Sequence, residues 1–406
     1  MYTTKRHYRK MISLPICVLL CLGIPRSLAF QEKQTRVQGI DFNLPKDSSL
    51  HLVVKEEQAS FGGGFGSGFN LTFDFEEEEE EEEVASSDVI TKEQAEHELS
   101  YQTVDEDGNL KDVQVKLKHA FVDYVNSYND KLKKAATAWD LVQRKRNRRN
   151  VFQEDTRFPI REAEAFAELP FSAVVAFNIE CSGVLVGERH VLTAAHCFHD
   201  GKRFIHKTKD IRVGFRKNKT LSSYDINNNP SKAFYWIRVA KINLPAAWSM
   251  PRYSRKGAFL PVPLHDDYAI IELKRSPDDR EPLGFSISSH MNAGAGTRLN
   301  MGAFDDTLDI SVMMYRFCPV AYEEQSMTYM FCDAKSGASG AGVYIRQWNG
   351  YLGEFERKIV GVFVGSHVLR EGSGREEIVN AALRLTPLKF AQVCFWVTGS
   401  YSDCHA

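Results

Sequence analysis

The sequence lacks the features that define several large classes of proteins. Its 51 basic and 53 acidic residues leave a net charge of only −2, and residues 150–406 alone carry 30 basic against 28 acidic residues. Binding to nucleic acid needs a concentrated cationic face, so we expect no nucleic-acid partner. No cluster of His, Cys and carboxylate residues has the spacing of metal ligands. We therefore expect no metal and no other cofactor.

Long apolar runs are also missing, and the one near the start is short. Residues 11–24 are mostly apolar and follow a basic stretch that contains Lys5 and Lys10, while Ser27-Leu28-Ala29 supplies small residues. This three-part pattern is typical of a secretory signal peptide. The alternative, a membrane anchor, would need about 20 apolar residues. We expect cleavage after Ala29, a secreted extracellular product and no membrane span.

Residues 30–149 differ in composition from the rest of the chain. They carry 25 acidic against 16 basic residues. Residues 61–69 are rich in glycine, and Glu76 to Glu83 is an unbroken run of eight glutamates. Because neither segment can bury a core, we expect residues 30–110 to be mostly disordered. The glutamate run is interpreted as a self-repelling spacer, with calcium or a basic partner as the alternative.

One part of this region predicts regular structure. Apolar residues recur at steps of three and four between residues 115 and 142, which indicates one amphipathic helix. The stripe consists of Leu117, Phe121, Val125, Tyr128, Leu132, Ala136, Trp139 and Val142. The stripe could pack on the globular part of the chain or find another partner.

A basic run, Arg144 to Arg149, follows the helix at the point where the composition becomes globular. Such a run is often a solvated face, but exposed linkers are where proteolytic nicking concentrates. Its paired and spaced arginines are of the kind that furin-type proprotein convertases favour. We expect cleavage after Arg149 by such a convertase. The chain then divides into a signal peptide, 1–29, a pro-region, 30–149, and a globular domain, 150–406.

The globular domain has the pattern of an all-β protein. Short runs rich in β-branched residues alternate with polar turns, and the one long helical segment is C-terminal, Pro387 to Val397. The expected strands are Ala173–Phe177, Gly183–Val186, Trp236–Val239, Tyr268–Leu273, Gly342–Ile345 and Lys358–Val364.

Within this domain stands the string Leu192-Thr193-Ala194-Ala195-His196-Cys197, with Cys181 sixteen residues before Cys197. Here the chain resembles the trypsin-like (chymotrypsin-fold) serine proteases, whose catalytic histidine lies in such a motif. The resemblance implies two antiparallel β-barrels, a disulfide between Cys181 and Cys197, and a catalytic role for His196. An isolated histidine on an apolar face would more often be a packed core residue, but the five matching neighbours argue against that here.

The resemblance implies two further catalytic residues. Asp267 precedes the run Tyr268 to Leu273, as the family's aspartate precedes its strand; Asp266 is its neighbour and rival, but only Asp267 fits the register Asp-x-Ala-x-x-x-Leu. Ser339 lies in Gly337-Ala338-Ser339-Gly340, where glycines let two N–H groups converge on one point. Ser339 would be the nucleophile, and the N–H groups of Gly337 and Ser339 would form the oxyanion hole. The chain order His, Asp, Ser is that of chymotrypsin.

Other strings, such as Arg316-Phe317-Cys318, resemble one secreted vertebrate group within that family. The chain departs from the family at its activation device. Ala338 stands where zymogens of this kind usually have an aspartate, and Asn150-Val151 is not the usual apolar start that pairs with it. We therefore expect cleavage to release the pro-region without building the oxyanion hole through that ion pair.

The remaining site assignments are less determined by pattern. Asp333, six residues before Ser339, occupies the position that in trypsin holds a cationic substrate side chain, so it predicts a preference for Arg or Lys. The alternative is an aspartate on a surface loop, or one that Lys335 neutralises. Asn70 and Asn218 are glycosylation acceptors.

Six of the eight cysteines lie after the signal peptide, and an even number in a secreted chain indicates three disulfides. Spacing suggests Cys318–Cys332 and Cys394–Cys404, although four cysteines allow three pairings.

Two functions remain open. The first is a secreted endopeptidase that hydrolyses protein or peptide substrates through His196, Asp267 and Ser339. The second is an extracellular binding protein that has the protease fold but is catalytically silent. A complete set of three catalytic residues favours the first.

Overall fold

The computed structural model describes residues 42, 44, 51–58, 89–140, 155–219, 229–250, 252–253, 259–260, 263–288, 297–306, 309–349, 353–370 and 376–405. All of them belong to one compact unit that spans Gly39–Ala406. The signal peptide with its cleavage site at Ala29, the glycine-rich and glutamate segments, Asn70 and the basic run up to Arg149 lie outside the described residues. No helix of the described residues is long and apolar enough to cross a membrane.

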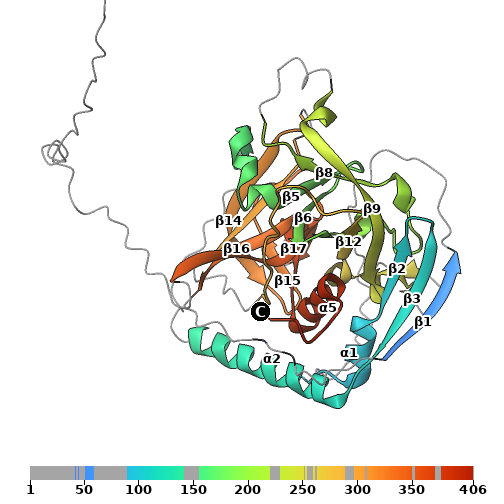
Figure 1. Ribbon diagram of the computed structural model, residues 1–406. Helices are drawn as coiled ribbons and strands as arrows, with labels where there is room; N and C mark the ends of the chain where they lie inside the picture. Colours follow the sequence, from blue (N-terminus) through green and yellow to red (C-terminus); the bar gives the residue numbers. More distant parts are fainter. Residues whose placement is uncertain are drawn as a thin grey trace, which may run out of the picture. The chain divides into compact units, whose positions relative to one another are not determined.

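Two closed antiparallel barrels form the globular domain, as the sequence predicted (Figure 1). In the first, the strand order β9-β12-β7-β6-β5-β8 closes because β8 also pairs with β9. Its strands are β5 (Val174–Phe177), β6 (Ser182–Gly187), β7 (His190–Thr193), β8 (Arg212–Arg216), β9 (Phe234–Pro245) and β12 (Ala269–Leu273).

The second barrel has the strand order β13-β16-β17-β18-β15-β14 and closes through pairing of β13 with β14. Strand β4 (Phe158–Ile160) extends it beside β14, and β10 (Arg252–Tyr253) pairs separately with β11 (Phe259–Leu260). The barrel strands are β13 (Arg298–Ala303), β14 (Met313–Glu323), β15 (Met327–Met330), β16 (Gly342–Asn349), β17 (Glu354–Arg370) and β18 (Glu376–Arg384).

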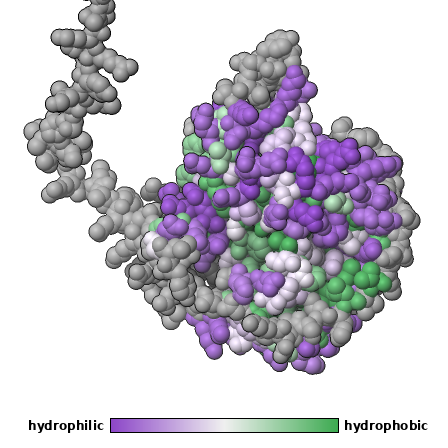
Figure 2. Space-filling model, viewed as in Figure 1, coloured by the Kyte–Doolittle hydropathy of each residue, from purple (hydrophilic) through white to green (hydrophobic). Residues whose placement is uncertain are grey.

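All six strands predicted in the globular domain overlap observed strands, because their apolar runs are buried in the barrel interiors. The C-terminal helix is also confirmed, as α5 (Pro387–Thr398). Pro387 at its start fixes a helical φ, Thr386 caps the N–H of Lys389, and Gly399 ends the helix with φ at +78°. The face shown in Figure 2 is mostly hydrophilic, in agreement with this burial of apolar side chains.

Residues 30–149, the expected pro-region, contain more structure than the single predicted helix. Helix α2 (His119–Asp140) falls within the predicted range, but α1 (Lys92–Leu99) and the strands β1 (His51–Gln58), β2 (Tyr101–Asp105) and β3 (Asn109–Lys116) also form. The expectation of disorder over residues 30–110 is therefore wrong for residues 51–58 and 89–110. Isolated strands are unstable, but these gain a partner because β2 pairs antiparallel with β9 and so adds the pro-region to the first barrel's sheet.

A shared apolar core joins the pro-region to the C-terminal helix. Phe121 and Leu99 are buried to 1% and 0% exposure, and they belong to one cluster with Phe390 and Cys394 of α5. The predicted stripe of α2 supplies much of this core, since Leu117, Phe121, Val125 and Tyr128 are all buried. Figure 1 shows α1 and α2 next to α5, with β2 beside β9.

Polar contacts within the same interface are also made. The side-chain amide of Gln392 donates to the carbonyl of Leu99 at 2.8 Å. The buried ammonium of Lys389 lies 3.3 Å from Glu98 of α1 and 3.8 Å from Asp266 of the first barrel. A buried ammonium needs such partners, because burying an unpaired charge is costly.

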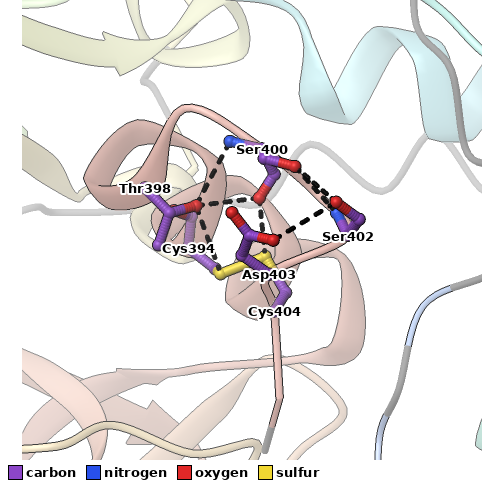
Figure 3. Close-up of a disulfide and its surroundings, with 6 residues drawn as sticks. All are labelled: Cys394, Thr398, Ser400, Ser402, Asp403 and Cys404. Atoms are coloured by element: carbon purple, nitrogen blue, oxygen red, sulfur yellow. Dashed lines mark hydrogen bonds between the residues drawn. A yellow bond between two sulfur atoms is a disulfide. The ribbon is translucent and has the colours of Figure 1, made fainter. Parts of the chain in front are cut away.

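The described residues contain three disulfides, Cys181–Cys197, Cys318–Cys332 and Cys394–Cys404, so the last four cysteines pair as their spacing suggested. The last of these folds the C-terminal segment back onto α5 (Figure 3). Within this hook the Thr398 hydroxyl donates to the carbonyl of Cys394 at 3.0 Å. Tyr401 packs edge-on against Phe121 of α2, with ring centroids 5.7 Å apart. The hook therefore forms part of the surface on which α2 packs.

Candidate active site

His196 lies in a short 3₁₀ turn, Ala195–Cys197, that follows β7. The disulfide from Cys197 to Cys181 ties this turn to the residue just before β6. The imidazole retains 16% exposure, so one edge of the ring remains accessible. The surrounding string Thr193-Ala194-Ala195 is buried, which fixes the position of the backbone that carries the ring.

Asp267 reaches His196 because of strand register. Strands β12 and β7 pair antiparallel with Ala269 opposite Thr193, and continuing that register by two residues brings Asp267 opposite Ala195. One carboxylate oxygen of Asp267 lies 2.6 Å from His196 Nδ1, and the other accepts the His196 backbone N–H at 2.8 Å. The Asp267 side chain is 1% exposed.

Asp266, the rival in the sequence, lies elsewhere. Its carboxylate is 3.8 Å from Lys389 and 3.5 Å from His265. The register of β12 thus separates the two neighbouring aspartates, and Asp267 is the one that contacts His196.

The pair changes the acid–base behaviour of the ring. Burial alone lowers the pKa of His196, but the negative charge and the hydrogen bond of Asp267 raise it by more, so the net pKa is above the ordinary 6.5. Because the Asp267 carboxylate accepts at Nδ1, the neutral ring carries its proton there. The neutral ring then has a lone pair on Nε2, which can accept a proton.

Ser339 lies in the loop between β15 and β16, and this loop packs on the histidine motif. The Ser182 backbone N–H donates to the carbonyl of Ser339 at 2.8 Å. Gly340 approaches the motif so closely that a Cβ there would lie 2.1 Å from Thr193 Oγ1 and 2.9 Å from Ala194 N. Only glycine fits, and its φ of +85° also requires it. The structure thus seats the Ser339 loop against the strand end that leads to His196.

Gly337 has a left-handed backbone, with φ at +98°, and is enclosed on two sides. The buried Ser182 hydroxyl donates to its carbonyl at 2.7 Å, and a Cβ on Gly337 would lie 2.6 Å from the carbonyl oxygen of Phe304. Ala338 is fully buried in an apolar cluster of the second barrel. An aspartate at this position would place a charge in an apolar cluster without a charged partner. Because burying an unpaired charge is costly, alanine suits this position.

Asp333 is engaged by the segment that follows the basic run. One of its carboxylate oxygens accepts from both the backbone N–H of Thr156, at 2.8 Å, and the Thr156 hydroxyl, at 2.7 Å. The ammonium of Lys335 lies 3.9 Å from Asp155, so its ion pair is with Asp155 and not with Asp333.

Two residues of this site were missed in the sequence. Ser182 directly follows Cys181, so its position beside the disulfide was a usable signal. Asp305 contacts the Ser339 loop through Lys335, whose backbone N–H donates to it at 3.0 Å. Nothing local marked Asp305, because its contacts with Lys335 and Arg157 join residues 30 and 148 positions apart in the chain.

The sulfur atoms of Cys181 and Cys197 lie within 4.8 Å of a His196 ring nitrogen, which is the spacing of a metal cluster. Both sulfurs are used by the disulfide. They therefore cannot act as the thiolates that a metal would need.

Comparison with known proteins agrees with this geometry. The trypsin family pattern matches residues 160–312. Serine protease 23 of Rattus norvegicus is 35% identical over 320 residues, which cover 77% of this chain and 79% of that protein. The chain therefore belongs to the trypsin-like family of serine proteases.

Within that family the similarity extends to two kinds of relative. Besides serine protease 23, inactive serine protease 35 of Rattus norvegicus is 30% identical over 349 residues, covering 77% of this chain and 81% of that protein. A solved structure of a Glu endopeptidase in complex with MPD is 15% identical, with a TM-score of 0.43, and covers 61% of this chain and 99% of that one.

Proposed function

We propose that this chain is a secreted serine endopeptidase, with Ser339 as nucleophile, His196 as general base and Asp267 as the residue that orients and charges the base. The observation that supports this most is the contact of 2.6 Å between His196 Nδ1 and the buried Asp267 carboxylate. It leaves Nε2 free to accept a proton, and the Ser339 loop is seated against the same motif.

The reaction follows from these roles. Ser339 Oγ forms a bond to the peptide carbonyl carbon while its proton moves to His196 Nε2, and the carbonyl oxygen becomes an oxyanion. The N–H groups of Gly337 and Ser339 stabilise that charge. The C–N bond then breaks, and His196 gives the proton to the leaving amine. Water repeats the sequence on the acyl-enzyme and regenerates Ser339.

A fluorophosphonate probe tests this proposal. The Arg149-cleaved protein should be labelled, and Ser339→Ala should abolish labelling while leaving folding intact, because it removes a hydroxyl and little volume. Labelling that persists in Ser339→Ala would remove Ser339 from the mechanism. Asp267→Asn should lower kcat by about 10⁴-fold, since the wrong histidine tautomer is then favoured.

The pH profile provides a second check. Because the pKa of His196 is raised above 6.5 and the base must be neutral, kcat/KM should fall with decreasing pH along a limb centred above 6.5. Triad residues act as a unit, so the losses in His196→Ala and Ser339→Ala should not add.

The binding-protein alternative is favoured by two observations. Ala338 replaces the usual aspartate, and a relative of this chain is named inactive serine protease 35. A folded, secreted protein that no fluorophosphonate labels under any condition would support this alternative.

Export and maturation belong to the same proposal. We expect signal cleavage after Ala29 and convertase cleavage after Arg149, so that N-terminal sequencing of the globular part begins at Asn150. Asn218 is exposed, as a glycan acceptor must be.

The preference for Arg or Lys also stays a proposal. It requires the Asp333 carboxylate, of which one oxygen is occupied by Thr156. A peptide-library profile of Asp333→Ser should lose any enrichment in Arg and Lys before the cleaved bond.

A further inference from the structure

A buried ion pair lies directly behind the Ser339 loop. Asp305 and Arg316 both have side chains that are 0% exposed. The guanidinium of Arg316 donates to both carboxylate oxygens of Asp305, at 2.6 and 2.8 Å. Such a bidentate pair fixes both groups in direction as well as distance.

A second guanidinium completes this network. Arg157, whose side chain is 3% exposed, lies 3.2 Å from the Asp305 carboxylate and donates to the Asp305 backbone carbonyl at 3.0 Å. Its other edge pairs with Asp155 at 2.7 Å. Two arginines and two aspartates thus balance in charge, with Asp155, which is 48% exposed, at the outer end of the network.

The network contacts the loop that carries the oxyanion donors. The Asp305 carboxylate accepts the backbone N–H of Lys335 at 3.0 Å, and the carbonyl of Lys335 accepts the N–H of Ala338 at 3.1 Å. Gly337 lies between them, and a Cβ there would lie 2.6 Å from the carbonyl oxygen of Phe304 and 3.3 Å from the Cα of Asp305. The turn 335–338 is therefore anchored at its first residue by Asp305.

The segment 155–157 contacts the same loop at two more points. The hydroxyl and the backbone N–H of Thr156 donate to the Asp333 carboxylate at 2.7 and 2.8 Å, and the Asp155 carboxylate lies 3.9 Å from the ammonium of Lys335. All of these groups are side chains or internal backbone atoms. None of the contacts uses the amine that cleavage after Arg149 would create.

We propose that Asp305, Arg316 and Arg157 are positioning residues that hold the Gly337 and Ser339 N–H groups in place for the oxyanion, in the uncleaved and the cleaved chain alike. The inference rests on the proposed function of Ser339. In this chain the charge that orders the loop comes from internal arginines, so cleavage after Arg149 is not what assembles the oxyanion hole.

The first experiment compares the cleaved protein with an uncleavable one, Arg146→Ala/Arg148→Ala/Arg149→Ala. The rate of fluorophosphonate labelling should agree within about twofold between the two. Labelling that is slower by about tenfold or more in the uncleavable chain overturns the inference.

The second experiment removes the anchors. Arg157→Gln should lower kcat by about tenfold with little change in KM, and Arg157→Lys should restore part of it, because loss of an oxyanion donor acts on the transition state. Arg384→Lys is the matched control: Arg384 is also buried in the second barrel but bonds to Ser288 and Glu324. An unchanged kcat in Arg157→Gln overturns the proposal.

Removing Asp305 alone would leave Arg316 buried without a partner, so the pair is replaced together. Asp305→Leu/Arg316→Met keeps the volume apolar and the fold intact, and should lower kcat by about 10²-fold. An active double variant with wild-type kcat contradicts a positioning role.

A readout without catalysis separates the two proposals. In a Ser339→Ala background, Asp305→Leu/Arg316→Met should speed hydrogen exchange at the Lys335 and Ala338 amides, which are the hydrogen-bonded ones of this turn. If the wild type is never labelled by the probe, the proposed function fails, while this measurement still decides whether Asp305 orders the loop. Exchange equal to that of Ser339→Ala alone overturns the inference.

Discussion

The segments on the two sides of Arg149 contact the barrels by different forces. Before it, residues 89–140 dock through a shared sheet and an apolar core that includes Phe121 and Leu99. After it, residues 155–157 dock through charges and hydrogen bonds to Asp305 and Asp333. The first segment contacts α5, and the second contacts the Ser339 loop.

The difference is suited to two tasks. Apolar burial is strong and non-directional, so it holds one body against another without placing single atoms. Bidentate ion pairs are directional and fix an atom's position. The contacts of residues 89–140 therefore favour attachment, and those of residues 155–157 favour the positioning of a loop.

The largest effect is expected on association. The disulfides of the described residues join cysteines between Cys181 and Cys404, and the only cysteines before Arg149 are Cys17 and Cys21 in the signal peptide. We nevertheless expect the two pieces of cleaved protein to co-elute in gel filtration, because β2–β9 pairing and the apolar core remain.

High salt should not separate these pieces, since it screens charges and not apolar contacts. Urea should separate them. Elution of a free pro-region from freshly cleaved protein in buffer would show that cleavage releases it, as the sequence alone suggested.

Phe121→Ala should weaken that attachment. Phe121 is 1% exposed and packs on Tyr401, so its loss should lower the free energy of unfolding by about 3–5 kcal/mol. Urea unfolding of the full chain measures this. Asp123→Asn, on an exposed position of the same helix, is the control, and equal losses in both variants would place Phe121 outside the core.

The hook closed by Cys394 and Cys404 should have a smaller effect. The bridge closes a loop of ten residues, so Cys394→Ala/Cys404→Ala should lower the free energy of unfolding by about 2–3 kcal/mol. The packing of Tyr401 against Phe121 would weaken, so release of the cleaved pro-region should require less urea. A double variant that holds the pro-region as tightly as the wild type would make the hook irrelevant to docking.

These two segments also differ in how far sequence could predict them. Helix α2 was predicted because its apolar stripe has a helical period. Strand β2 was missed because among its residues only Val104 is buried, so its apolar pattern is weak, although it lies between β3 and β9 in the sheet. Its stability comes from pairing with β9, which no local pattern in the strand records.

The residues of the candidate site also differ in how far the sequence could predict them. His196, Asp267 and Ser339 were predicted because each lies in a short string with a resemblance to a family. The pair Asp305–Arg316 was not predicted, because no local pattern records that residues eleven apart meet through the pairing of β13 with β14. Buried ion pairs between elements leave no periodic signal.

The smallest effect is expected from the exposed end of the ionic segment. Asp155 accepts two hydrogen bonds from the Arg157 side chain, at 2.7 and 2.9 Å, and these lower the pKa of its carboxyl from 3.8 to about 2. A lowered folded-state pKa means that the carboxylate stabilises the fold above pH 3.8 and that this contribution is lost as the pH falls toward 2. Asp155 is 48% exposed, so solvent screening should keep the loss of unfolding free energy in Asp155→Asn below about 1 kcal/mol at pH 7.

Urea unfolding at several pH values should show the unfolding free energies of wild type and Asp155→Asn converging as the pH approaches 2. Asp278→Asn, which removes the more exposed ion pair with Arg275, is the matched control. A difference between wild type and Asp155→Asn that persists unchanged at pH 2 would mean that Asp155 acts through its size or hydrogen bonding and not through its charge.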